Sequence, residues 1–160
     1  MRRVFVDARS IHAGLLLGLA GCGGPRRATV HPVAGTLTVR DRPAAHVMVA
    51  YHPLGRVAVG ESLPVGCTGP DGRYRLMTYA AGDGAPAGDY AVTVVWPEDS
   101  PPGDECPGET THDRFEGRYA DPASSPWRVT VGPGTNEVPL RLDAPAGMVA
   151  TTPSPETPGE

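Results

Sequence analysis

Lysine is absent from this chain of 160 residues, and all 14 of its basic residues are arginine. Schiff-base chemistry and P-loop nucleotide binding both need a lysine amine, so the composition excludes them. Cysteine is scarce, with three residues, and aromatic residues make up only 6% of the chain. Long apolar runs are missing too. The longest, near the N-terminus, has about ten apolar residues, whereas a membrane-spanning helix needs about 20.

Glycine and proline are abundant instead, with 21 and 19 residues, which together form a quarter of the chain. Both residues interrupt helices, so this composition disfavours long helices. It favours either disorder or a β-protein with many turns.

The N-terminus has the order of regions typical of an export signal. "MRRVFVDAR" is basic, and "IHAGLLLGLAG" is a short apolar stretch that ends in small residues. A buried N-terminal helix is the alternative, but Gly14, Gly18 and Gly21 would weaken it.

The residues "LAGC", Leu19 to Cys22, resemble the lipobox of bacterial lipoproteins. The resemblance implies that the Cys22 thiol receives a diacylglyceryl group, that cleavage makes Cys22 the first residue, and that its amine is acylated, for example with palmitate. Several acyl chains hold a protein on a membrane where one chain binds only marginally. The membrane is therefore an expected partner, through the lipid anchor.

Two aspects of export stay open. "RRVFV" weakly resembles a twin-arginine signal, but Asp7 replaces the expected basic residue, so the general secretory and twin-arginine routes are both retained. Gly23 follows the cysteine in place of the aspartate that some bacteria use for inner-membrane retention. This favours the outer membrane or the periplasmic face as the location.

The chain divides into four parts: a signal peptide (1–21), a flexible spacer (22–32), a folded domain (33–143) and a Pro- and Thr-rich tail (144–160) that is predicted to be disordered. Removing residues 1–21 takes away three Arg and one Asp, which changes the formal charge from −4 to −6. A net acidic chain without lysine is a poor nucleic-acid binder.

Apolar residues alternate with polar ones through the folded part, which is typical of antiparallel strands with one buried face. The alternating segments are "GTLTV", "HVMVAY", "RYRLMT", "YAVTVVW", "WRVTV" and "NEVPLRL". "GPDGRY" and "GPGTNE" have the residues of tight turns, the second as a hairpin after Val131. We therefore predict an all-β fold, an antiparallel two-sheet β-sandwich with about seven strands.

Three segments resemble the carboxypeptidase regulatory-like family, whose members have a transthyretin-like β-sandwich: "GTLTVRDRPAAHVMV", "GCTGPDGRYRL" and "GAPAGDYAVTVVW". The matching positions are Gly35, Leu37, Pro43, Val47, Thr68, Asp71, Gly72, Tyr74, Leu76, Pro86, Gly88, Tyr90 and Val92. "RFEGRYADPASSPWRVTV" resembles a stretch in small lipoproteins of this type from planctomycete-like bacteria. Ala45 stands where the family commonly has glycine, and residues 97–113 form a long insertion. The resemblance implies a non-catalytic accessory domain and supplies no active site.

Cys67 and Cys106 remain once Cys22 is lipidated. In an oxidising compartment they are candidates for one disulfide, which would attach the insertion to the region of Cys67. Two free thiols are the alternative, because spacing alone does not show that the Cα atoms come within about 7 Å.

Catalytic and metal-binding patterns are weak. His46 and His52 would lie roughly 20 Å apart on an extended strand, too far to chelate one ion. The acidic residues Asp83 and Asp89 and those of 97–116 match no calcium-loop spacing. The serines lack a nucleophile-elbow motif. We expect no enzymatic activity, no metal and no cofactor.

The aromatic residues around the insertion offer two interpretations. Trp96 and Trp127 continue the inward-facing pattern and are expected in the core, although tryptophans at a sandwich rim can stack on sugars. Phe115 and Tyr119 are four residues apart and are predicted to form a small exposed patch for a ligand or partner, within the contact loop 97–125.

The sequence thus predicts a membrane-anchored, non-catalytic β-sandwich lipoprotein of the cell envelope, which acts as a binding or structural module. An envelope protein or a polysaccharide is the expected partner. The alternatives are a carbohydrate-binding module and an accessory subunit of an exported peptidase or transport complex.

Overall fold

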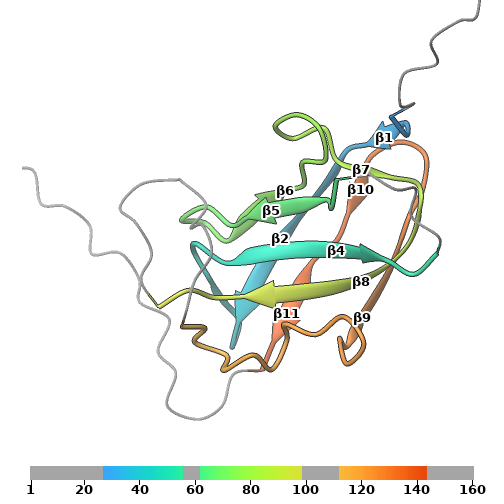
Figure 1. Ribbon diagram of the computed structural model, residues 1–160. Coiled ribbons are helices and arrows are strands. Elements are labelled where there is room, and N and C mark those ends of the chain that lie inside the picture. The colour runs from blue at the N-terminus through green and yellow to red at the C-terminus, as the bar shows by residue number, and fades with distance from the viewer. Residues whose placement is uncertain (1–26, 56–61, 99–111, 144–160) are drawn as a thin grey trace, which may run out of the picture.

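The computed structural model describes residues 27–55, 62–98 and 112–143. These ranges contain eleven β-strands (Figure 1). Nine of them form two main sheets that pack across a hydrophobic core, and the other two pair in a small separate sheet. No helix that could cross a membrane is present in them. The predicted all-β sandwich is confirmed. Seven of the eleven strands are three residues or longer, in agreement with the predicted number.

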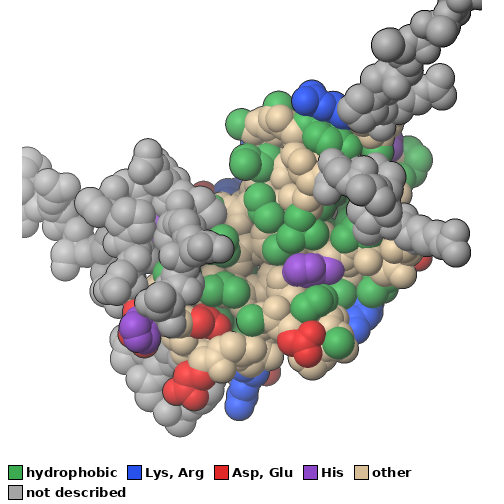
Figure 2. Space-filling view, in the orientation of Figure 1, with side chains coloured by type: hydrophobic (Ala, Val, Ile, Leu, Met, Phe, Trp, Pro, Cys, Tyr) green, Lys and Arg blue, Asp and Glu red, His purple; other side chains and the backbone are tan. Residues whose placement is uncertain are grey.

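The first sheet is fully antiparallel. Its strands, in spatial order, are β5 (Val65–Cys67), β4 (Met48–Pro53), β8 (Gly88–Val95) and β9 (Trp127–Val131). Figure 2 shows the outward face of β4 and β8, where hydrophobic and uncharged polar surface dominates and charged side chains lie toward the margin. This face carries little charge.

The second sheet is built around β2 (Val33–Val39). β6 (Arg73–Arg75) and β3 (Arg42–Pro43) pair antiparallel with it, whereas β10 (Asn136–Glu137) and β11 (Leu140–Leu142) pair parallel with it. β10 and β11 keep one common register against β2, so they form one strand that is interrupted at Pro139. Proline has no N–H to donate to the ladder, which explains the break.

The parallel pairing of β10 and β11 with β2 departs from the antiparallel arrangement predicted for the sandwich. It also corrects the predicted hairpin at "GPGTNE", because β9 pairs with β8 while β10 pairs with β2 in the other sheet. The turn therefore carries the chain from one sheet to the other. Asn136 stabilises it: its Oδ1 accepts a hydrogen bond from Gly132 N, and its Nδ2 donates to the carbonyls of Gly132 and Gly134.

The folded domain begins earlier than predicted. The predicted spacer includes residues 30 and 31, but β1 (Val30–His31) pairs antiparallel with β7 (Ala85–Pro86). Gly84 permits this close approach, since a Cβ at that position would collide with the His31 carbonyl. The predicted signal peptide, Cys22 and the predicted C-terminal tail lie outside the described residues.

The core contains the side chains that the alternation predicted to point inward. Those at most 4% exposed include Leu37, Val39, Val49, Tyr51, Tyr74, Leu76, Tyr90, Val92, Val94, Trp96, Val131, Leu140 and Leu142. The outward face of β8 departs from the pattern, because Ala91 and Thr93 are also buried. Ala91 lies in register between His52 and Arg128, whose longer side chains flank it.

Candidate functional site

The exposed patch predicted at Phe115 and Tyr119 is wrong. Phe115 is only 3% exposed and belongs to the core, and Tyr119 is partly buried against it. The two rings make an edge-to-face contact, with 5.2 Å between centroids. An aromatic ring beside an open sandwich edge gains more free energy by covering the core than by remaining in water.

The rings of residues 115 and 119 extend a row of aromatic contacts between the two tryptophans. Trp96 lies 5.5 Å from Phe115, and Trp127 lies 5.3 Å from Tyr119. Trp96 is 4% exposed, which confirms the expected core position, and Trp127 is partly buried against the core. The Trp96 ring therefore presents no open face for stacking on a sugar.

Hydrogen bonds to the Asp113 carboxylate hold this part of the loop in place. Its Oδ1 accepts from the backbone N–H groups of Trp96 and Phe115, and its Oδ2 accepts from that of Gly117. The Arg114 guanidinium lies 5.0 Å from the Trp96 ring centroid and donates to the Pro97 carbonyl. The described part of the predicted contact loop therefore serves as a cover for the core.

The cysteines are only partly described. Cys67 lies at the end of β5 and is partly buried, and its position alternates with the inward-facing Gly66. Cys22 and Cys106 lie outside the described residues, so lipidation and the Cys67–Cys106 disulfide stay predictions.

Polar groups elsewhere serve the fold. Ser125 Oγ donates to the Val92 carbonyl, and the Asp83 carboxylate accepts from the backbone N–H groups of residues 78, 79 and 80. Although burial raises the pKa of Asp83, these hydrogen bonds outweigh it and lower the pKa below 3.8. Within 27–55, 62–98 and 112–143, no three His, Cys, Asp or Glu side chains gather as a metal site would require.

Two buried tyrosines connect the sheets. Tyr74 Oη donates to the Val138 carbonyl at 2.7 Å, and Tyr51 Oη lies 3.1 Å from Tyr74 Oη. Tyr74 has one hydroxyl proton, so Tyr51 is the donor of the second bond. Burial raises the pKa of Tyr51 to about 12 and raises that of Tyr74 well above its usual range. Both phenols stay neutral near pH 7 and take the role of structural groups.

His46 and His52 make separate contacts. His46 precedes β4 with a left-handed φ of 59°, and its backbone N–H donates to the Thr68 carbonyl. His52 lies on β4, with its Nε2 2.8 Å from Thr93 Oγ1. Burial lowers the pKa of His52 below 6.5, so this ring is neutral at pH 7.

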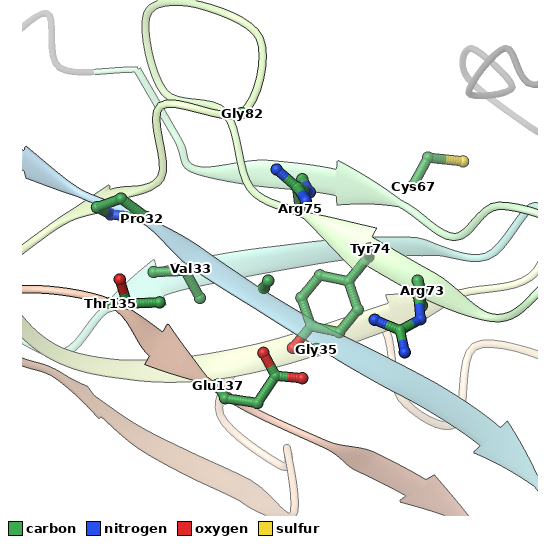
Figure 3. A pocket seen from close by; sticks show the side chains of 11 residues that line it. Pro32, Val33, Gly35, Cys67, Arg73, Tyr74, Arg75, Gly82, Thr135 and Glu137 are labelled. Atoms are coloured by element: carbon green, nitrogen blue, oxygen red, sulfur yellow. The ribbon is translucent and has the colours of Figure 1, made fainter.

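A pocket of about 680 Å³ lies over β2 (Figure 3). Its lining includes Pro32, Ala34, Arg73, Arg75, Thr135 and Glu137. Figure 3 shows the two arginines on the β6 side of β2 and Glu137 on the β10 side. Because positively and negatively charged side chains converge on one hollow, this pocket is the candidate binding site of the described residues.

The register of the second sheet explains the arrangement. Glu137 pairs with Ala34, and Ala34 pairs with Arg75, so the three form one row across the sheet. Neighbouring strands lie about 4.8 Å apart, which separates the outer two backbones by nearly 10 Å. The methyl group of Ala34 is too small to fill the space between the long side chains, and a hollow results.

Sequence reasoning missed this site. The alternation in "RYRLMT" already placed Arg73 and Arg75 on the outward face, which was the available signal. Glu137 is more than 60 residues further along the chain, and only the pairing of β10 and β6 with β2 brings it opposite the arginines.

No protein-family model and no curated protein matches this chain. Among solved structures, it is similar to a DUF3823 family protein from Parabacteroides merdae, with 16% sequence identity and a TM-score of 0.38. The similarity covers 74% of this chain and 48% of that protein's chain. The chain thus corresponds to about half the length of that structure.

Proposed function

We propose that this protein is a lipid-anchored, non-catalytic β-sandwich module of the bacterial cell envelope, of the carboxypeptidase regulatory-like type found in planctomycete-like lipoproteins. The observation that carries the proposal is the "LAGC" sequence, with Cys22 directly after a basic and then apolar N-terminal stretch. The module binds a ligand or partner on a rigid sandwich held at the membrane surface. Its location is the outer membrane or the periplasmic face.

Lipid labelling tests the anchor. We expect cells fed a tagged palmitate to label the wild-type protein, and the protein to partition into detergent. The Cys22→Ser variant should lose both properties, whereas Cys67→Ser should keep them because Cys67 belongs to the folded domain. Label retained in Cys22→Ser, or a mature protein that begins with unmodified Met1, would contradict the proposal.

Two alternatives remain, a carbohydrate-binding module and an accessory subunit of an exported peptidase or transport complex. The pocket over β2 favours the carbohydrate-binding role, because its charged walls and open shape suit a polar ligand. Pull-down from solubilised envelopes, with and without residues 97–113, tests the subunit role. Turnover assays on sugars and peptides should stay flat, and robust turnover would overturn the non-catalytic assignment.

A further inference from the structure

We propose that the pocket over β2 binds a carboxylated saccharide, with Arg73 and Arg75 holding the carboxylate and Glu137 accepting hydrogen bonds from hydroxyl groups. This proposal deepens the carbohydrate-binding alternative and rests on it. It does not depend on the lipid anchor.

The two arginines form one wall of the pocket. They are two residues apart on β6, so their side chains leave the same face of the strand about 7 Å apart. Both are exposed, whereas Tyr74 between them is buried. A carboxylate on a ligand can reach both guanidinium groups, which recognise carboxylates through paired N–H donors.

The positive charges of Arg73 and Arg75 are largely available to a ligand. The Nε of Arg73 lies 3.4 Å from Asp71 Oδ2, an exposed pair of the kind that contributes little. Within the described ranges, Arg75 has no carboxylate partner at ion-pair distance. The chain as a whole carries a formal charge of −4, so this pair of arginines is a local reversal of its sign.

Glu137 makes the opposite wall of the pocket acidic, but it does not neutralise the two arginines. Glu137 and Arg75 are separated by the full width of β2 and form no ion pair. A ligand that fits this gap needs an anionic group at one end and hydrogen-bond donors at the other. A uronate sugar has both, and the pocket of about 680 Å³ is large enough for a short oligosaccharide.

An acidic peptide is a poorer match. A second carboxylate on the ligand would face Glu137 and be repelled. The pocket walls stand on paired strands, because β2 is hydrogen-bonded to β6 on one side and to β10 on the other. The site is therefore held in shape before a ligand arrives.

Titration of the purified full-length protein with tetragalacturonate, by calorimetry and by amide NMR, tests the site. We expect chemical-shift changes at Ala34 and Thr36 and a Kd that weakens with added salt. Methyl-esterified tetragalacturonate, which lacks the charge, should bind at least about tenfold more weakly, since a charge-assisted pair is lost.

Variants locate the binding. Arg75→Gln and Arg73→Gln should each weaken binding about tenfold. Arg141→Gln is the matched control, because Arg141 is an exposed arginine of β11 in the same sheet but does not line the pocket. We expect its Kd to change less than twofold. Thermal unfolding of all three should match the wild type, because each of these side chains is exposed.

These measurements distinguish a failure of the pocket proposal from a failure of the carbohydrate-binding alternative. Saccharide binding that persists in Arg73→Gln and Arg75→Gln would overturn this pocket and leave a carbohydrate-binding module standing. Equal affinity for the esterified saccharide, tighter binding of an acidic peptide, or no binding of the charged saccharide would each overturn the proposal. Failure of the wild-type protein to take up tagged palmitate would contradict the lipid anchor but not the saccharide site.

Discussion

The buried phenols of Tyr51 and Tyr74 connect the two sheets by a hydrogen bond between their hydroxyl groups. Tyr51 belongs to β4 in one sheet and Tyr74 to β6 in the other, and the chain of hydrogen bonds ends on the Val138 carbonyl. Alternation predicted that both rings point inward. It did not predict that their hydroxyl groups would meet, because that contact depends on how the two sheets are placed against each other.

Removing either hydroxyl should destabilise the protein, by unequal amounts. Tyr51→Phe removes one hydrogen bond, so we expect a loss of about 1 kcal/mol in the free energy of unfolding. Tyr74→Phe removes two and leaves both Tyr51 Oη and the Val138 carbonyl unpaired, so the loss should be about 2–3 kcal/mol. Urea unfolding measures both values. Tyr119→Phe is the control, because its hydroxyl makes only a long contact of 3.5 Å with Asp143. A larger loss for Tyr51→Phe would contradict the assigned donor.

The same pair predicts a response to alkali. The pKa of Tyr51 is raised to about 12 in the folded protein, compared with 10.0 for a free phenol. A raised pKa of an acid contributes stability that is complete below pH 10 and is lost as the pH rises toward 12. Absorbance of the phenolate should therefore show a fraction of the five tyrosines that ionises late, together with unfolding.

Among the elements, β2 decides most of the architecture, because four strands pair with it. β2 contains Gly35, where the backbone passes close to Val138, between β10 and β11. A Cβ there would collide with the Val138 carbonyl and lie 2.9 Å from Tyr74 Cε1. The family resemblance marked this glycine, but the reason for it lies in a contact more than 100 residues away.

Gly35→Ala should consequently be costly. Crowding of a packed interior destabilises by roughly 1–3 kcal/mol, and this substitution would also displace the acceptor of the Tyr74 hydroxyl. Gly55→Ala is the matched control, because a Cβ at Gly55 has no atom within 4 Å. Urea unfolding of both variants measures the difference. Equal stability of the two would show that β2 can move away from Val138.

Prediction was most accurate for elements whose pattern is local. The turn at "GPDGRY" is as expected: Gly72 has φ 74°, and Asp71 Oδ1 accepts from Arg73 N. Prediction failed where the partner of an element had to be chosen, as with β10. Alternation identifies which side of a strand is buried, but it contains no information about the strand alongside.

For the whole molecule, a sandwich in an oxidising compartment would gain from a covalent link between the insertion and β5. We expect Cys67 and Cys106 to be disulfide-bonded in the exported protein, which would stabilise it by about 4 kcal/mol in the chain-entropy description. Alkylation should modify these cysteines only after reduction, and reduction should lower the melting temperature of the wild type but not of Cys67→Ser. Alkylation of both cysteines without reductant would contradict the disulfide.

The strand content, the inward-facing residues and the tight turn before β6 could be predicted from the sequence, because each depends on neighbours a few positions apart. Lipidation at Cys22 is likewise a prediction from a linear motif. Three other features depend on the tertiary structure: the parallel pairing of β10 and β11 with β2, the burial of Phe115, and the placement of Arg75 and Glu137 on opposite sides of Ala34. Each of these joins segments far apart in the chain, and such contacts are set by the packing of the whole sandwich.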